Sequence, residues 1–350
     1  PEEVKRKMTI DSSLASCEWQ GYKINFIDTP GYPDFTGEVK SALTACESAI
    51  VVVSATSGIE VETDRAWKYA EELSLPRAIF INKMDREHAD FYKVVEELRA
   101  HFGKGIVPIQ IPIGSEASFQ GVADLITMNT KVLIKNKDLI YEIPEYMKDE
   151  VDTARHMLME TCAEFNDELL EKYLEGEELT EEEIMTGIRK QTIACKMTPV
   201  CCGSSYKNKG VQPLLDAIVA FMPAPTDIPH IKGVNPETGE EDERPSSDEE
   251  PFAALAFKIM TDPYVGKLAF FRVYSGTLES GSYVYNSTKG KRERIGRILQ
   301  MHANHRQEIE KVYAGDIAAA VGLKDTTTGD TLCDEKAPII LESMVFPDPV

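Results

Sequence analysis

The stretch from residue 24 to residue 31, Ile-Asn-Phe-Ile-Asp-Thr-Pro-Gly, most constrains the fold of this chain. Its closely spaced apolar residues predict a short strand buried on both faces in a helix-flanked sheet. Asp28 ends the strand, and open α/β sheets bind ligands at the carboxyl ends of their strands, where a carboxylate can hold Mg²⁺. Pro30 and Gly31 then turn the chain, and the Gly31 N–H can approach an anion. An ordinary loop would fit the same residues, so this stretch alone leaves both interpretations open.

A second polar tetrad, residues 82–85 (Asn-Lys-Met-Asp), follows another apolar run at residues 78–81. The Asp85 carboxylate can accept hydrogen bonds from N1–H and the exocyclic amine of a guanine, while the Asn82 amide bonds the base edge. The Lys83 stem can pack on the ring, and its ammonium can order the loop. These side chains are thus compatible with a guanine base at the end of this second strand.

The two tetrads fit the patterns D-x-x-G and N-K-x-D, about fifty residues apart in a βα pattern. In these motifs the sequence resembles the translational GTPases. The resemblance implies that the Gly31 N–H binds the γ-phosphate and that Asp28 serves Mg²⁺. It also implies that residues 6–10, Arg-Lys-Met-Thr-Ile, belong to the first switch, with Lys7 in place of the family's glycine. Thr9 is then the residue that coordinates Mg²⁺ and senses the γ-phosphate.

Two further positions are interpreted through the same resemblance. Residues 203–205, Gly-Ser-Ser, follow the apolar residues 199–202 and match the family's fifth motif, which implies that Ser204 and Ser205 contact guanine O6. Tyr32 stands where the family usually has the histidine that orients the attacking water. A tyrosine hydroxyl, with a pKa of about 10, stays neutral and can only donate or accept a hydrogen bond. Tyr32 is therefore the candidate catalytic residue, and an aromatic side chain packed on the next helix is the alternative.

The phosphate-binding loop G-x-x-x-x-G-K-[ST] is absent from this sequence. In P-loop enzymes that loop supplies backbone N–H groups, a lysine and a hydroxyl ligand of Mg²⁺. The loss of four charge-assisted hydrogen bonds of about 1.5 kcal/mol each would weaken nucleotide binding roughly 10⁴-fold. We therefore expect this chain to bind GTP or GDP poorly, to be inactive as a hydrolase, and to be a fragment without its first strand and P-loop.

The order of the predicted elements indicates the fold class. Alternating strands and helices predict a parallel sheet, and short strands separated by turns from residue 251 onward predict a small closed β-barrel. The fold class is thus α/β, with a P-loop GTPase-type parallel sheet and an α+β insertion, followed by an all-β translation-factor barrel. The expected domains are the GTPase domain at 1–114 and 193–228, an acidic inserted subdomain at 115–192, an acidic linker at 229–250 and the barrel at 251–350.

The barrel closely resembles domain two of elongation factor G over residues 252–273, 290–305 and 313–333. The chain is thereby identified as similar to elongation factor G, as a paralogue without the P-loop segment and the C-terminal domains. The resemblance implies a GTPase that binds the ribosome and, when intact, couples GTP hydrolysis to translocation of tRNA and mRNA. Two alternatives stay open. One is a GTPase like a ribosomal-protection protein or release factor three, and the other is a non-catalytic ribosome-binding regulator.

Charge is distributed unevenly along the chain, whose net charge is −21. Residues 141–190 hold 16 Asp and Glu against 5 Lys and Arg, which excludes a uniformly basic nucleic-acid binder. This acidic insertion either only solubilises the protein or approaches a ribosomal stalk protein, as the resemblance suggests. Residues 289–311 hold 7 Lys and Arg against 3 Asp and Glu. There Arg292, Arg294 and Arg297 either contact ribosomal RNA or merely solvate an outer strand face.

The remaining composition points to the cytoplasm. The seven cysteines are scattered without metal-ligand spacing, which fits a reducing compartment. The chain shows neither a membrane-length apolar stretch nor a signal peptide. We therefore expect a cytoplasmic monomer without a membrane partner.

Overall fold

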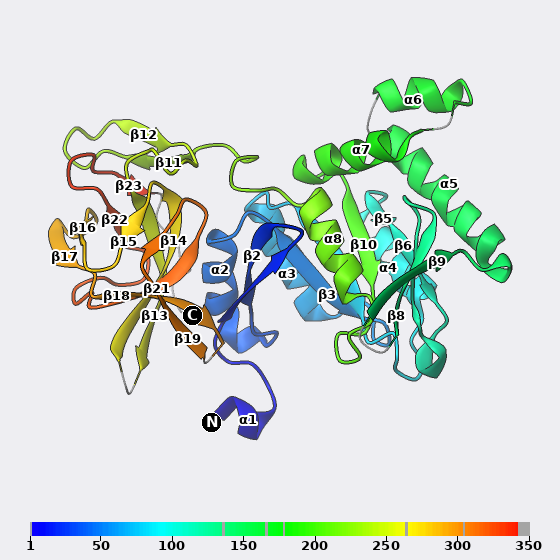
Figure 1. Cartoon of the computed structure of the whole chain (residues 1–350), viewed down its shortest axis with the longest axis horizontal. Helices are drawn as coiled ribbons and strands as arrows, with labels where there is room; N and C mark the ends of the chain where they lie inside the picture. Colours follow the sequence, from blue (N-terminus) through cyan, green and yellow to red (C-terminus); the bar gives the residue numbers. More distant parts are fainter. Residues whose placement is uncertain are drawn as a thin grey trace. The chain divides into compact units, whose positions relative to one another are not determined.

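The computed structural model describes residues 2–341 apart from 135–136, 165–166, 178, 263–264 and 304. The described chain forms two compact units (Figure 1). One unit contains residues 48–222, and the other combines the segment up to residue 47 with the chain from residue 223 onward. Residues 342–350 of the expected barrel domain lie outside the described residues.

The unit of residues 48–222 is built on a four-stranded parallel sheet in the order β3-β4-β10-β5. Helices alternate with these strands, as the sequence predicts, and the predicted fold class is confirmed. The strands are β3 (Ala49–Ser54), β4 (Arg77–Asn82), β10 (Thr198–Cys202) and β5 (Ile106–Pro108), and the helices are α3 (Val61–Glu72), α4 (Phe91–Phe102) and α8 (Val211–Phe221).

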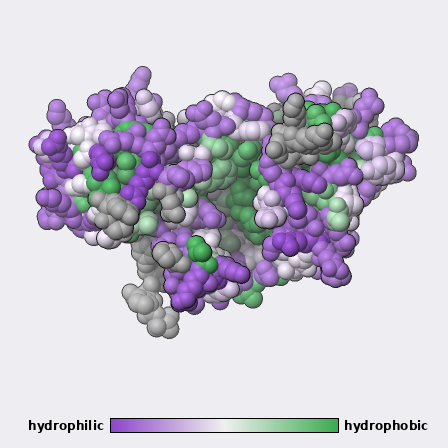
Figure 2. Space-filling model, turned by 60° about the horizontal axis from the view of Figure 1, so that its bottom comes forward, coloured by the Kyte–Doolittle hydropathy of each residue, from purple (hydrophilic) through white to green (hydrophobic). Residues whose placement is uncertain are grey.

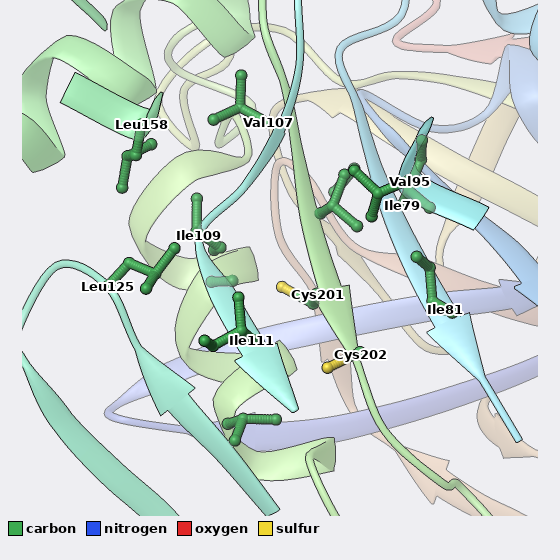
Figure 3. Packing of buried hydrophobic residues seen from close by; sticks show 14 of the residues in the cluster. Ile79, Ile81, Val95, Val107, Ile109, Ile111, Leu125, Leu158, Cys201 and Cys202 are labelled. Carbon is green, nitrogen blue, oxygen red and sulfur yellow. The ribbon is translucent and has the colours of Figure 1, made fainter. Parts of the chain in front are cut away.

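The central strands of this sheet are covered on both faces. Ile79 and Ile81 of β4 and the adjacent Cys201 and Cys202 of β10 are fully buried, and Figure 3 shows them packed within one apolar cluster. The cysteine pair is thus part of a buried strand. The edge strand β3 is less buried, because Val52 is 59% exposed while its neighbours Val51 and Val53 point into the core.

The insertion begins with an antiparallel sheet in the order β6-β7-β8-β9 and continues with acidic helices. The strands are β6 (Gln110–Ile113), β7 (Gly121–Asp124), β8 (Asn129–Ile134) and β9 (Lys137–Glu142), and the helices are α5 (Lys148–Glu164), α6 (Asp167–Leu174) and α7 (Glu181–Ile193). Thr180 and Glu183 form a reciprocal capping box at the start of α7. None of the described helices is long and apolar enough to cross a membrane.

The other unit contains an eight-stranded antiparallel sheet in the order β17-β16-β22-β13-β14-β21-β18-β19, which matches the predicted all-β barrel region. Its strands are β13 (Ala253–Asp262), β14 (Gly266–Ser275), β16 (Tyr283–Asn286), β17 (Lys291–Arg294), β18 (Arg297–His302), β19 (His305–Ile309), β21 (Ile317–Val321) and β22 (Thr331–Cys333). Two short strands, β15 (Leu278–Glu279) and β20 (Lys311–Val312), pair separately.

The N-terminal segment packs in the same unit as the barrel. It contains α1 (Glu2–Arg6), β1 (Ser13–Trp19), β2 (Tyr22–Asp28) and α2 (Thr36–Thr44). Residues 22–28 do form the expected strand, but the expectation that it is buried on both faces in a helix-flanked sheet is wrong for the described structure. Among the described strands β2 pairs with β1 alone, and none of its residues is fully buried. The hairpin instead places Leu14 and the partly buried Ile27 against barrel residues such as Phe257, because apolar side chains without a sheet neighbour must find another surface.

The acidic segment before the barrel is also more ordered than a linker. The strands β11 (Ile231–Val234) and β12 (Glu241–Arg244) form a hairpin, and β11 also pairs with β23 (Ile340–Leu341). The side chain of Asn235 accepts hydrogen bonds from the backbone of Glu237 and Thr238, which fixes the turn. Turn chemistry and strand pairing therefore outweigh the acidic composition here.

Candidate functional site

The predicted base-recognition loops meet because their strands are neighbours. β4 and β10 run parallel with Ile81 opposite Cys202, so the residues that follow them lie at the same edge of the sheet. The Gly203 N–H donates to the Ile81 carbonyl at 2.9 Å, and the Met84 N–H donates to the Gly203 carbonyl at 3.1 Å. The tetrad 82–85 and the motif 203–205 are thus joined through their backbones.

Asn82 organises both loops. Its Oδ1 accepts a hydrogen bond from the Lys83 N–H at 2.8 Å and another from the Ser205 N–H at 3.0 Å. Lys83 adopts a left-handed backbone conformation with φ of 65°, which is uncommon for a residue other than glycine and occurs where surrounding contacts enforce it. The amide of Asn82 is therefore oriented by two fixed donors before any ligand arrives.

The two serines are already engaged within their loop. The Ser204 side chain is buried, and its Oγ accepts a hydrogen bond from the Lys207 N–H at 3.3 Å. The backbone N–H of Ser205 is the group bound to Asn82. By contrast, the Asp85 carboxylate forms no hydrogen bond or ion pair within the described chain, which leaves a half-buried acceptor at the mouth of the two loops.

Sequence reasoning missed what shapes this loop. A Cβ at Gly203 would lie 2.4 Å from the Lys209 carbonyl oxygen, and Gly210 has a φ of 79° with the Cys202 carbonyl equally close, so both positions require glycine. The Lys209 ammonium donates to the Phe119 carbonyl at 2.6 Å and ties the loop to the insertion. Gly203 and Gly210, at the two ends of the loop, are the sequence feature that could have predicted this tight loop.

The residues proposed for Mg²⁺ and the γ-phosphate lie in the other unit. Asp28 ends β2, and Thr9 is half-buried just ahead of the hairpin. The carboxylate of Glu3 accepts hydrogen bonds from the Ile10 and Asp11 N–H groups at 2.8 and 3.2 Å, which orders the segment after Thr9. Although solvent reaches Asp28, partial desolvation and then the nearby Glu3 charge raise the pKa of its carboxyl. No hydrogen bond joins Thr9 to Asp28 in the described part of the chain.

Thr9 and Asp28 carry the hydroxyl and carboxylate oxygens that Mg²⁺ prefers as ligands. Mg²⁺ in nucleotide sites is usually held by one or two protein oxygens, with the remainder supplied by phosphate and water. A cation beside Asp28 would also offset the repulsion from Glu3. A cluster of three or more His, Cys, Asp or Glu side chains able to hold a metal is not found among the described residues.

Gly31 and Tyr32 follow Asp28 in an open turn. A Cβ at Gly31 would meet nothing within 4 Å, and the residue does not have a positive φ. Neither packing nor backbone strain explains the glycine. Tyr32 precedes the short helix η1 (Pro33–Phe35) and is 55% exposed. Its hydroxyl makes no hydrogen bond within the residues that the structure describes.

The barrel arginines face solvent but have partners. In β17 the side chains of Arg292 and Arg294 point outward while Glu293 points inward. Arg292 lies 4.5 Å from the Tyr283 ring centroid and 3.6 Å from the Glu335 carboxylate. The Nε of Arg294 donates to the Gly281 carbonyl at 3.3 Å. Arg297 pairs loosely with Glu308, at 3.8 Å.

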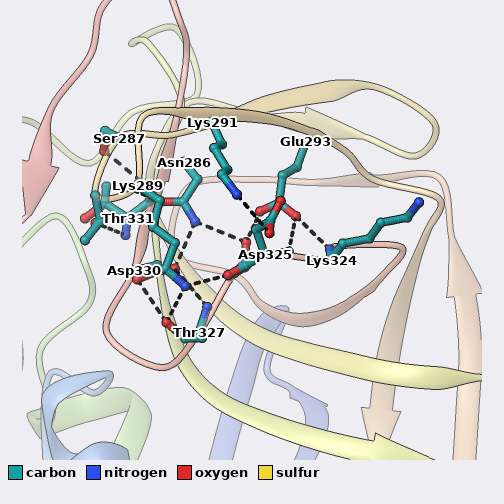
Figure 4. Close-up of polar contacts among 12 residues, drawn as sticks. Asn286, Ser287, Lys289, Lys291, Glu293, Lys324, Asp325, Thr327, Asp330 and Thr331 are labelled. Atoms are coloured by element: carbon teal, nitrogen blue, oxygen red, sulfur yellow. Dashed lines mark hydrogen bonds and ion pairs between the residues drawn. The ribbon is translucent and has the colours of Figure 1, made fainter.

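The lysines of the basic segment are largely neutralised within the barrel (Figure 4). The ammonium of Lys289 contacts Asp330 at 3.1 Å and the Thr327 hydroxyl at 2.8 Å, and Lys291 pairs with Asp325 at 3.1 Å. These contacts fix the loop around residues 325–330 and pair each ammonium with a carboxylate. The positive surface that remains for a polyanion is therefore carried mainly by the arginines of β17 and β18.

Comparison with known proteins gives two family matches. Residues 1–224 match the family described as Elongation factor Tu GTP binding domain, and residues 251–335 match Elongation factor G domain 2. Among solved structures, the chain is similar to a crystal structure from Thermus thermophilus, with a TM-score of 0.82 and 29% sequence identity. The match covers 97% of this chain and 48% of that chain, so this chain spans about half the length of the structure it resembles. The resemblance predicted from the motifs and the barrel is confirmed.

Proposed function

This chain belongs to the family of the elongation factor Tu GTP-binding domain, and from that premise we propose that it is the nucleotide-binding and barrel part of an elongation factor G-like GTPase. One observation carries the proposal. A GTP-binding domain over residues 1–224 and an elongation factor G domain 2 over residues 251–335 occur in the same chain. In the proposed function, GTP hydrolysis on the ribosome is coupled to translocation of tRNA and mRNA. The domain boundaries 1–114 with 193–228, 115–192, 229–250 and 251–350 belong to this proposal.

The base-recognition half of the proposed mechanism uses the unit of residues 48–222. Asp85 accepts from the guanine N1–H and amine, Asn82 binds the base edge, and the Lys83 stem covers the ring. Ser204 and Ser205 complete the loop near guanine O6. The bond from the Ser205 N–H to Asn82 supports this assignment, because it aligns the two loops in advance and lowers the entropy cost of binding.

The phosphate half uses the N-terminal segment. Thr9 and Asp28 would hold Mg²⁺, and the Gly31 N–H would bind the γ-phosphate. The metal supplies neutralisation of phosphate charge when it is bound. Tyr32 would orient the attacking water through its hydroxyl. Loss of the γ-phosphate would release both segments, which is the usual behaviour of GTPase switches.

A second candidate function is a ribosome-binding regulator without catalysis. The exposure of Tyr32 favours it, since its hydroxyl has no acceptor among the described residues and is poorly fixed for positioning water. A ribosomal-protection or release factor three-like GTPase remains the alternative within the same class.

The proposed partner is the ribosome, and the proposed location is the cytoplasm. Ribosomal RNA would contact Arg292, Arg294 and Arg297, whose side chains face solvent on the barrel. The acidic helices of the insertion would approach a ribosomal stalk protein. The protein is proposed to act as a monomer.

Titration of fluorescent GDP and GTP tests the proposal. Two chains are compared: this chain, and this chain preceded by a phosphate-binding loop segment of the matched family. Ribosome-stimulated phosphate release is then measured for both. Binding and turnover by the second chain support the GTPase. Tight binding without turnover favours the regulator and implicates Tyr32, whereas no binding by either chain contradicts guanine-nucleotide function.

A matched pair of variants makes the titration specific for guanine. Asp85→Asn places an amide where the base presents donors, so we expect GDP binding to weaken by about 100-fold or more. Glu87→Gln changes an exposed neighbour of the same loop and should leave the affinity unchanged. Equal affinities for the two variants would remove Asp85 from the base site.

A further inference from the structure

Lys258 is a buried lysine to which the proposed function gives no role. It lies in β13 of the barrel, and its side chain is 7% exposed. The pairing of β13 with β14 shifts register between Ala256 and Lys258, with Phe257 as the extra residue. Such a bulge re-aims the side chains that follow it. Burial of an ammonium is costly unless acceptors surround it, so its contacts must compensate.

Three oxygen atoms accept hydrogen bonds from the Lys258 ammonium, and the Asp11 carboxylate lies 3.8 Å from it. The ammonium donates to the Ser12 carbonyl at 2.9 Å, to the Ser12 Oγ at 3.1 Å and to the Glu38 carboxylate at 2.8 Å. The same Glu38 oxygen accepts from the Ser12 N–H at 3.0 Å and from the Ser12 hydroxyl at 2.7 Å. Burial alone raises the pKa of Glu38, but the Lys258 and Ser12 donors outweigh burial and lower it. Lys258, Glu38 and Ser12 therefore form one connected cluster, which we name the Lys258 cluster.

The members of the Lys258 cluster come from three distinct segments. Ser12 is three residues after Thr9, and Glu38 is in the first turn of α2, seven residues after Gly31. Lys258 belongs to the barrel. One ammonium thus contacts both segments for which a role at the γ-phosphate is proposed, and it joins each of them to β13.

The far end of α2 is held by the barrel as well. The Tyr274 hydroxyl donates to the Thr44 carbonyl at 3.1 Å, and Arg272 donates to the Ala45 carbonyl at 3.0 Å. Arg272 also pairs with Glu47. Both ends of α2 are therefore bonded to barrel strands. A displacement of one end cannot leave the helix free to rotate about the other end.

We propose that Lys258 is the positioning residue that ties the segment around Thr9 to α2 and ties both to the barrel, so that a change at either phosphate-sensing segment is passed to β13. This inference rests on the proposed function for the meaning of those two segments. The contact itself can be tested without nucleotide.

Hydrogen exchange on the full chain tests the link. Lys258→Met keeps the length of the side chain and removes its three donors. We expect exchange in residues 10–13 and in α2 to accelerate by at least about tenfold, because local opening no longer breaks charge-assisted bonds. Amides of the barrel core in β14 and β21 should exchange as before, which separates loss of positioning from general destabilisation. Lys291→Met, on an exposed barrel lysine, is the control and should change neither segment.

Two further variants keep the test decisive if Lys258→Met does not fold. Glu38→Gln removes charge from a partner that solvent reaches and should accelerate the same segments, while Lys258→Arg should restore part of the protection. Unchanged exchange at residues 10–13 and α2 would overturn the inference and leave the proposed function intact. Failure of the nucleotide titration would instead overturn the proposed function, and with it the sensing role of Lys258.

Discussion

At the scale of single residues, Arg272 has the largest expected effect on stability. Its guanidinium is 2% exposed, pairs with Glu47 and lies 5.1 Å from the Tyr274 ring centroid. Burial alone lowers the pKa of Arg272, but the Glu47 charge outweighs it and the net shift is upward. Arg272→Met leaves Glu47 uncompensated, so we expect a loss of about 3 kcal/mol in the free energy of unfolding, measured by urea denaturation.

Two comparisons make that measurement specific to the ion pair. Arg294→Met removes an exposed arginine of the same barrel and should cost less than about 0.5 kcal/mol. The double variant Arg272→Met with Glu47→Gln should recover part of the loss, since it removes the charge that was left unpaired. A loss no larger than that of Arg294→Met would contradict the assigned role.

Two carboxylates of the N-terminal segment predict opposite dependences of stability on pH. The pKa of Asp28 is raised in the folded protein, so folding favours the protonated carboxyl. The contribution of Asp28 to stability is therefore fully present below the pKa of the unfolded chain and is lost as the pH rises through the pKa of the folded protein. Asp28→Asn should therefore stabilise the protein at pH 7, by less than about 1 kcal/mol because solvent screens the carboxylate. The lowered pKa of Glu38 has the reverse sign, so its contribution is present above its ordinary pKa and lost as pH falls.

Urea denaturation at several pH values checks this pair. The advantage of Asp28→Asn should grow between pH 3 and pH 7, whereas the deficit of Glu38→Gln should shrink as the pH is lowered. Parallel pH curves for both variants would mean that neither carboxyl is perturbed in the folded state. Asp28 is thus expected to lower the stability of the free protein while serving as a proposed Mg²⁺ ligand. Such a conflict between stability and function is common at functional sites.

At the scale of elements, the cap of α7 gives the cleanest test. Thr180 Oγ1 accepts from the Glu183 N–H at 3.2 Å, and the Glu183 carboxylate accepts from the Thr180 N–H at 3.0 Å. Thr180→Ala should cost about 1 kcal/mol in unfolding free energy. Thr186→Ala, at an exposed position inside the same helix, should be neutral or slightly stabilising because alanine has the higher helix propensity. Equal effects would show that the cap contributes nothing.

Elements whose signals are local were predictable from the sequence. The capping box, the hairpin strands of the insertion and the antiparallel barrel depend on neighbouring residues and turns, and the structure contains them. The placement of β2 was predictable only in part. The Gln20-Gly21 turn predicts its pairing with β1, which the structure contains. The apolar pattern does not show whether a further strand joins its other edge, and among the described strands none does.

The candidate site was predictable only where a motif marks it. The tetrad 82–85 and the motif 203–205 were expected to lie together, and hydrogen bonds join them. Lys258 carried no such signal, because a single lysine in a strand is ordinarily exposed and a bulge cannot be read from the residues around it. Its role depends on Ser12 and Glu38, more than two hundred residues away in sequence.

At the scale of the whole molecule, charge decides how this protein can approach a polyanion. The net charge is −21, and most of the surface visible in Figure 2 is hydrophilic. Long-range repulsion from RNA is therefore expected except where positive side chains gather. Arg292 and Arg294 satisfy that condition on β17, with the Tyr283 ring beneath Arg292 as a rigid support.

The double variant Arg292→Glu with Arg294→Glu should weaken ribosome binding at every salt concentration and reduce the magnitude of the slope of log affinity against log salt by about 2. Binding releases counterions in proportion to the number of phosphates that the protein contacts. When two contacts are lost, fewer counterions are released, so the slope falls together with the affinity. Lys104→Glu alters an exposed cation in the other unit and should leave the slope unchanged. If the double variant weakens binding without changing the slope, the arginines act through barrel stability, and an unfolding measurement would show it. If neither quantity changes, the RNA contact lies elsewhere on the protein.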